Sequence, residues 1–218
     1  MKKTLLIAVC AICFFSLCTG AYAEGERTWK FGVGAEVSFL KTLNYDVDDV
    51  VDTEQTFEAT AMPGVNMTFF FNQYFSTELT LAYAKYEMEL DVPGTKIEQG
   101  ELEQVPLLLT FRAHMPSDGG FSPYIGAGLS YFFNDFDMSD FYSRNLAKGT
   151  SIDPDDGLGF HANLGVEIDV TDNVSFDIDG KYTWYEEEFV IKSPGNRDRQ
   201  EDVELNSLSI GAGMKVYF

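Results

Sequence analysis

Hydrophobic and polar residues alternate along eight separate segments of the chain. In the first of them, Phe31, Val33 and Val37 stand at odd-numbered positions, and small or charged residues stand between them. Because successive side chains of a β-strand point to opposite faces, each segment predicts a strand with one apolar face and one small or polar face. The predicted strands cover residues 29–39, 65–71, 78–84, 105–114, 124–133, 158–169, 174–184 and 207–218.

The connections between these strands alternate between long and short. A soluble β-sandwich would also show alternating residues, so the connections decide between the two folds. Alternating long loops and tight turns are typical of a membrane barrel with short periplasmic turns and long extracellular loops. The pattern therefore predicts an all-β fold, an eight-stranded antiparallel up-and-down transmembrane β-barrel. The long connections are 43–58, 88–104, 134–157 and 186–202, and the short ones are 72–75, 115–120 and 171–173.

Aromatic residues gather near both ends of the predicted strands. Phe31, Phe71 and Phe218 fall at the ends that lead into short turns, whereas Tyr131 and Trp184 fall near the long loops. Aromatic side chains are enriched at both interfaces of a bilayer. The two groups are expected to form two girdles.

The first 23 residues have the three parts of a secretory signal peptide. Lys2 and Lys3 precede an apolar stretch, and Ala21 and Ala23 form a small-residue cleavage site. Residues 24–218 are then expected to form one outer-membrane barrel domain in a Gram-negative bacterium, with no periplasmic domain. The three cysteines lie within the predicted signal, which excludes disulfides and a catalytic thiol from the mature chain. No run of 18 apolar residues follows, so a membrane-spanning helix is excluded.

The mature chain is strongly acidic, because 35 acidic and 13 basic residues remain after the predicted signal. Nucleic acid is excluded as a partner on this ground. The four long loops together carry a net charge of −17. They are expected to face lipopolysaccharide, which is anionic as well. One hypothesis is that Mg²⁺ or Ca²⁺ bridges acidic loop residues to lipid phosphates. The alternative is a solvated acidic face that repels the lipid. The candidate loop residues are Asp46, Asp48, Asp49, Asp137 and Asp140.

Four segments of the chain have a distinctive sequence: EQVPLLLTFRAH (103–114), SPYIGAGLSYFF (122–133), GFHANLGVEIDVTDN (159–173) and LSIGAGMKVYF (208–218). Together they resemble the OmpW family of small outer-membrane proteins. The resemblance implies an eight-stranded barrel that carries small hydrophobic compounds into or across the outer membrane. The alternating end formed by Met214, Val216 and Phe218 also resembles the signal read by the barrel-assembly machinery.

Charged residues occupy the inward positions in the periplasmic half of the predicted barrel. The inside of an eight-stranded barrel is narrow, and charges there are costly unless they are paired. Two interpretations stay open, an ion-pair network that plugs the barrel and a path for protons or ions. The residues are Lys30, Glu78, Arg112, His114, Glu167, Asp169, Asp177 and Lys215.

The inward positions beneath the long loops are mostly apolar. They predict either a pocket for a small hydrophobic ligand or simple packing of the barrel mouth, and the family resemblance favours the pocket. The residues are Met62, Tyr86, Met88, Leu108, Phe132, Tyr185 and Leu205.

Two prolines suggest how such a ligand leaves, since the charged half offers no apolar path. Pro63, followed by Gly64, and Pro106 lie on either side of the third predicted strand. Proline removes a hydrogen-bond donor from a sheet, so the wall could open sideways at this height. The resemblance implies the same, because a lateral route has been proposed for the OmpW family. Alternatively, both prolines only mark the starts of strands.

No enzyme activity, cofactor or metal is predicted. Acyl transfer needs a nucleophile and a base, and the candidate bases His114 and His161 point inward with no serine close by in sequence. The function that the OmpW resemblance implies is binding of small hydrophobic compounds and their passage into or across the outer membrane. The alternative is a structural or surface-interaction barrel with a plugged interior and no transport role.

Overall fold

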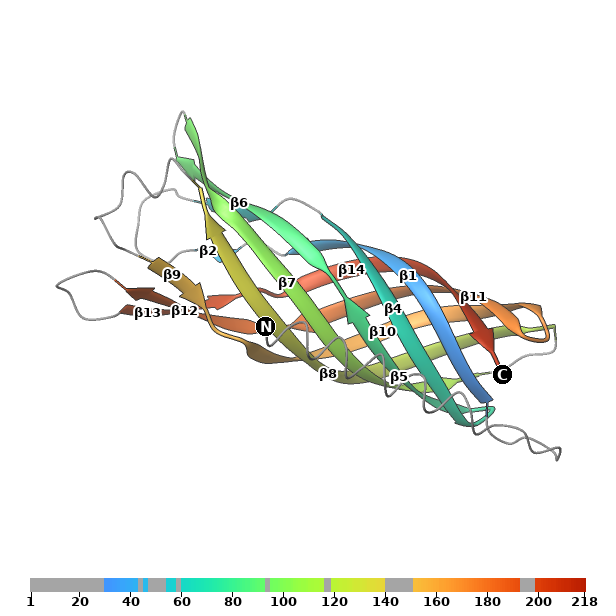
Figure 1. Cartoon of the computed structure of the whole chain (residues 1–218). Coiled ribbons are helices and arrows are strands. Elements are labelled where there is room, and N and C mark those ends of the chain that lie inside the picture. Colours follow the sequence, from blue (N-terminus) through green and yellow to red (C-terminus); the bar gives the residue numbers. More distant parts are fainter. Residues whose placement is uncertain are drawn as a thin grey trace.

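The computed structural model shows a closed antiparallel β-barrel, and the predicted fold is confirmed (Figure 1). It describes residues 30–42, 45–46, 54–57, 60–92, 95–115, 119–139, 151–192 and 199–218. Hydrogen bonds between the first and last barrel strands close the wall. The wall consists, in order, of β1 (Lys30–Thr42), β4 (Thr60–Asn72), β5 (Phe75–Ala82) continued by β6 (Ala84–Val92), β7 (Thr95–His114), β8 (Phe121–Met138), β10 (Gly157–Thr171), β11 (Val174–Trp184) and β14 (Ser207–Tyr217).

The predicted signal peptide and its cleavage site lie outside the described residues. Asp48, Asp49 and Asp140 lie outside them too, as do the side chains of Asp46 and Met88. In the part of the chain that is described, no helix is both long and apolar enough to cross a membrane.

The barrel wall is apolar outside and polar inside. Phe39 and Leu164 expose 67% and 69% of their surface, whereas the inward Asn163, next to Leu164, exposes 5%. A lipid-facing wall explains this inversion of the usual burial pattern, because outward side chains lie against hydrocarbon rather than water. The alternation in the sequence thus separates the lipid face from the lumen.

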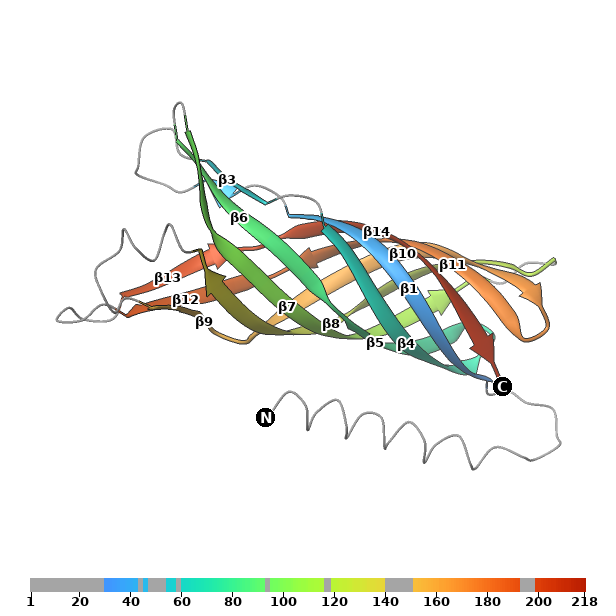
Figure 2. The same cartoon turned by 45° about the horizontal axis from the view of Figure 1, so that its top comes forward.

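The four long connections contain strands that the sequence pattern did not predict. β7 has 20 residues, and at about 3.3 Å per residue it is much longer than the hydrocarbon core of about 30 Å requires. Above the membrane both faces of a strand meet water, so alternation disappears while main-chain pairing continues. Figure 2 shows β3 beside β6, and a separate small sheet of β9, β12 and β13. The remaining strands are β2 (Tyr45–Asp46), β3 (Glu54–Phe57), β9 (Ser151–Pro154), β12 (Glu186–Lys192) and β13 (Arg199–Glu204).

Two of the short turns are closed by a side chain at their first residue. The Oδ1 atom of Asn72 accepts hydrogen bonds from the main-chain N–H groups of Tyr74 (2.8 Å) and Phe75 (3.0 Å). The Oγ1 atom of Thr171 does the same for Asn173 and Val174. Such local bonds favour a tight turn over a continued strand. We call this end of the barrel the turn end, and the opposite end the mouth.

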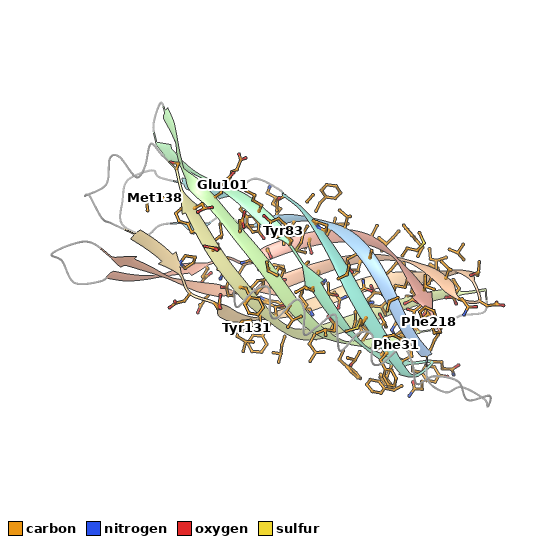
Figure 3. The ribbon with its side chains drawn as sticks, viewed as in Figure 1. Phe31, Tyr83, Glu101, Tyr131, Met138 and Phe218 are labelled. Atoms are coloured by element: carbon orange, nitrogen blue, oxygen red, sulfur yellow. The ribbon has the colours of Figure 1, made fainter. Side chains whose placement is uncertain are left out.

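Large side chains surround the wall near both ends. Figure 3 shows Phe31 and Phe218 together at the turn end, and Tyr83 and Tyr131 farther toward the mouth. Phe218 is also held by its main chain, since its N–H donates to the carbonyl oxygen of Phe31 at 2.8 Å. Met214, Val216 and Phe218, the predicted assembly signal, all point outward and are exposed.

Candidate functional site

Buried apolar residues form a cluster inside the mouth. At its centre the rings of Phe132 and Tyr185 lie 4.2 Å apart between their centroids. Its residues come from β1, from β4 to β8, and from the two ends of the connection between β11 and β14, so they meet across the mouth. Its members are Leu40, Met62, Ala82, Ala84, Tyr86, Leu102, Phe132, Tyr185 and Leu205.

A cavity of about 10 Å³ lies within this cluster. That volume is close to the minimum that holds one water molecule. A drug-sized ligand requires several hundred Å³, so side chains of the mouth must move before one can enter. The lining residues are Thr42, Tyr86, Leu102, Gln104, Phe132, Tyr185, Leu205 and Ser207.

Four buried, uncharged side chains form a hydrogen-bonded row across the mouth, which we call the polar band: Tyr86, Gln104, Asn134 and Tyr185. The Tyr86 hydroxyl donates to Gln104 Oε1 at 3.4 Å, and Gln104 Nε2 donates to Asn134 Oδ1 at 3.0 Å. Asn134 Nδ2 then donates to the Tyr185 hydroxyl at 2.7 Å. The mouth is therefore not a purely apolar plug.

An ion-pair network fills the barrel beneath the mouth. Lys215 Nζ lies 2.7 Å from Glu78 Oε2, 3.4 Å from Asp177 Oδ2 and 3.9 Å from Glu167 Oε2. Arg112 forms a second ion pair with Glu78 and lies 3.8 Å from Asp177. Because each charge has opposite charges within 4 Å, burial in the narrow lumen is offset by pairing.

An aromatic floor closes the turn end below this network. The ring of Phe70 lies 5.8 Å from that of Tyr217 and 4.8 Å from that of His114, which in turn lies 5.2 Å from Tyr124. The Tyr217 hydroxyl donates to Glu167 at 2.6 Å. Lys30 Nζ lies 4.0 Å from the centre of the Tyr217 ring. Aromatic rings tied to the ion pairs thus cover the lumen at this end.

Both histidines are held between hydroxyl groups from other strands of the barrel. His161 contacts Thr110 and Ser130, each at 2.8 Å. His114 contacts Ser76 at 2.8 Å and Ser122 at 3.4 Å. Sequence proximity could not find these partners, because all four hydroxyls come from other strands.

The two prolines flank one interruption in the barrel wall. The third barrel strand is broken at Tyr83, between β5 and β6. Tyr83 donates its N–H to the carbonyl of Pro63 at 3.0 Å, and the register of β5 and β6 against β7 places Ala82 opposite Pro106. Neither proline has an N–H to return to the carbonyl opposite it. β4 begins at Thr60 and β7 at Thr95, so neither proline marks a strand start.

The sequence matches the OmpW family over residues 33–218. The chain belongs to the OmpW family. Its relatives are named outer-membrane proteins, and this chain is an outer-membrane protein as well.

Relatives and solved structures support this membership. An uncharacterized outer-membrane protein of Sinorhizobium fredii, y4mB, is 22% identical to this chain, and the match covers 92% of this chain and 84% of the length of y4mB. The crystal structure of OprG from Pseudomonas aeruginosa superposes with a TM-score of 0.75 at 18% identity, over 89% of this chain and 98% of OprG. The NMR structure of E. coli OmpW gives a TM-score of 0.55 at 18% identity, over 89% of this chain and the whole of that one. At these identities the structures show a shared fold.

Within this OmpW-family barrel, five of the predicted pocket residues come together. Met62, Tyr86, Phe132, Tyr185 and Leu205 belong to the mouth cluster. Of the other two candidates, Met88 has its side chain outside the described residues. Leu108 is buried but lies deeper, opposite Ser130, and does not line the cavity.

Several lining residues were missed by the sequence prediction. Leu102 and Gln104 fall in a segment expected to be a loop, although they continue the inward parity of Leu108 and Pro106. Extending that parity by two more steps would have found them. Thr42 and Ser207 pair directly across β1 and β14, a contact that only closure of the barrel creates.

Two corrections apply to the predicted charge network. Asp169 has the inward parity of Glu167 but is exposed at the turn end, beside Gly120. Lys30 sits on the aromatic floor rather than among the ion pairs. The network extends instead toward the mouth, where Asn66 donates to Glu36 at 2.8 Å, Asn163 donates to Asp179 at 3.0 Å, and Lys181 lies 4.0 Å from Asp179.

Proposed function

We propose that this OmpW-family barrel binds small hydrophobic compounds at its mouth and releases them sideways into the outer membrane. The observation that carries the proposal is the position of the wall interruption. Ala82 belongs to the apolar cluster of the mouth, and the break between β5 and β6 at Tyr83 follows it directly. An apolar ligand held in the cluster would thus lie beside the place where the wall has lost donors.

Passage straight through the barrel is physically unfavourable for an apolar ligand. It would have to displace paired charges, including Glu78, Arg112 and Lys215, which are each about 1% exposed or less. Separating buried ion pairs costs several kcal/mol per charge, of order 3–5. The aromatic floor adds a second barrier. The lateral route avoids both, because it leads directly from the mouth into hydrocarbon.

A reversible disulfide between β4 and β5, placed beside the interruption, tests the lateral step. A Cβ atom at Gly64 would lie 3.1 Å from the Cβ of Ala82, close to the separation of about 3.5–4.5 Å in disulfides. We expect the Gly64→Cys/Ala82→Cys variant to take up a labelled long-chain hydrocarbon slowly when oxidised, and at the wild-type rate after reduction. The single-cysteine variants are the controls. Equal uptake by the oxidised and reduced forms would contradict the lateral route.

A second experiment restores the missing donors. Pro63→Val and Pro106→Val should each lower uptake, because valine can complete the ladder between its strand and the third strand. Pro123 offers a matched control, since it lies inside β8 at the turn end, paired with Val166. Pro123→Val should leave uptake unchanged. Folding of all variants is checked by the shift in gel mobility between unheated and boiled samples.

The alternative function is a structural or surface-interaction barrel that transports nothing. The closed mouth favours it, since the cavity there measures only about 10 Å³. Comparing hydrocarbon uptake by cells with and without the wild-type protein separates the two functions. Uptake that does not depend on the protein would support the structural role.

A further inference from the structure

The polar band places hydrogen-bonding groups where apolar packing alone would have sufficed. Tyr86, Gln104, Asn134 and Tyr185 are all more than nine-tenths buried. Replacing both partners of a buried hydrogen bond by apolar groups of the same shape is nearly neutral, so a mouth that served only as a plug would gain little from these bonds. Their presence points to recognition of a polar group.

Gln104 is the member of the band best placed to recognise a ligand. Its side chain lines the cavity. In its described contacts it donates one amide hydrogen to Asn134 and accepts one bond from Tyr86. A primary amide has two hydrogens and two acceptor positions, so Gln104 retains the capacity to donate and to accept once more.

The cavity around this amide has the size of one small polar group. Hydroxyl-bearing residues Thr42, Tyr86, Tyr185 and Ser207 line it together with Gln104. Its volume of about 10 Å³ suits one oxygen-sized group with several polar partners. The apolar part of the lining, Leu102, Phe132 and Leu205, suits the adjoining hydrocarbon of the same molecule.

The charge around the cavity selects against anions. No charged side chain lines it among the residues that the structure describes. At the rim, the Asp156 carboxylate accepts a bond from the main-chain N–H of Asn134 at 3.1 Å, and the long loops carry a net charge of −17. A carboxylate would enter against like charge and be buried without a cationic partner.

We propose that the mouth selects neutral amphipathic molecules, with one uncharged hydroxyl, ketone or amide group on an apolar chain, over alkanes and carboxylates of equal length. This inference rests on the proposed function, since it specifies the compounds that the mouth binds. An alkane in the cavity would offer no hydrogen bond to the remaining donor and acceptor positions of Gln104. A neutral polar head can form such a bond while its tail lies in the apolar cluster.

The test measures binding of labelled dodecane, 1-dodecanol and dodecanoate to the mature barrel in lipid nanodiscs at neutral pH, with protein-free nanodiscs to subtract partitioning. We expect dodecanol to bind about three- to tenfold more tightly than dodecane, the factor that one neutral hydrogen bond contributes. Dodecanoate should bind most weakly.

Gln104→Met keeps the length of the side chain and removes its amide. We expect this variant to lose the preference for dodecanol while still binding dodecane. Gln73→Met is the matched control, because it makes the same change at an exposed residue of the first short turn, outside the cavity lining. It should keep the wild-type preference. If Gln104→Met does not fold, the order of the three ligands on the wild-type protein still decides.

The outcomes separate the two proposals. Equal binding of dodecanol and dodecane, or tightest binding of dodecanoate, would overturn the selection while leaving hydrophobic binding intact. A preference for dodecanol that survives in Gln104→Met would overturn the role of the polar band. If no ligand binds the barrel above the protein-free background, both proposals fail.

Discussion

Removing the buried cation Lys215 should destabilise the barrel far more than removing an exposed lysine with the same contact distance. Lys215 Nζ lies 2.7 Å from Glu78, and Lys85 Nζ also lies 2.7 Å from Glu101. The side chains of the first pair are 1% exposed, whereas those of the second are 41% and 40% exposed. Burial is therefore the main difference between the two ion pairs.

The expected magnitudes follow from that difference. Lys215→Met leaves Arg112 as the cation paired with Glu78 and Asp177, and it removes the ion pair of Glu167. We therefore expect the free energy of unfolding to fall by about 3–5 kcal/mol. Lys85→Met should lower it by about 0–1 kcal/mol, because water and salt screen an exposed pair. Adding Glu78→Gln to Lys215→Met should recover part of the loss, since it removes one uncompensated carboxylate.

Urea unfolding of the barrel in phosphatidylcholine vesicles, followed by tryptophan fluorescence and gel mobility, measures these changes. The chain has two tryptophans that report on the transition. Equal losses in Lys215→Met and Lys85→Met would refute the reasoning. The reasoning would also be refuted if the stability loss of the double variant equalled the sum of the losses measured for Lys215→Met and Glu78→Gln singly.

Two further predictions concern the turn end. Gly32→Ala places a Cβ against the ring of Tyr217 and should lower the free energy of unfolding by about 1–3 kcal/mol through overpacking. Gly180→Ala is its control, because the nearest atom to the added Cβ is 4.0 Å away. It should lower the stability less than Gly32→Ala in the same urea titration. Asn72→Ala removes both bonds that close the first turn and should cost about 1 kcal/mol, the typical contribution of a net hydrogen bond. Unchanged stability of Asn72→Ala would show that the main chain alone forms this turn.

The strands could be predicted because apolar residues that face lipid alternate along the sequence with polar or small residues that face the lumen. Each lipid-facing residue is followed by a lumen-facing one, and this holds from Val174 to Trp184 without interruption in the sheet. Where the strands leave the bilayer the alternation is no longer required, because both faces of each strand contact water. That is why the sequence pattern stopped near Gln104, although β7 begins at Thr95.

The candidate site depended more on the tertiary structure. Parity placed Asp169 and Asp177 on the same inward face, yet Asp177 is 4% exposed and Asp169 is exposed at the turn end. The height of a residue depends on strand tilt and on the stagger between neighbouring strands, which are properties of the closed barrel. The same stagger brings Gln104 to Asn134 and Tyr86, and places Pro106 and Pro63 on either side of the break at Tyr83.

The sequence by itself thus determined which side chains face lipid and which face the lumen, because the bilayer imposes that choice on every second residue. Closure of the barrel decided which inward side chains meet. Hydrogen bonding between β1 and β14 set one register for the whole wall, and that register turned separate inward residues into a floor, an ion-pair network and a closed mouth. These contacts join residues far apart in the chain, and no local pattern specifies them.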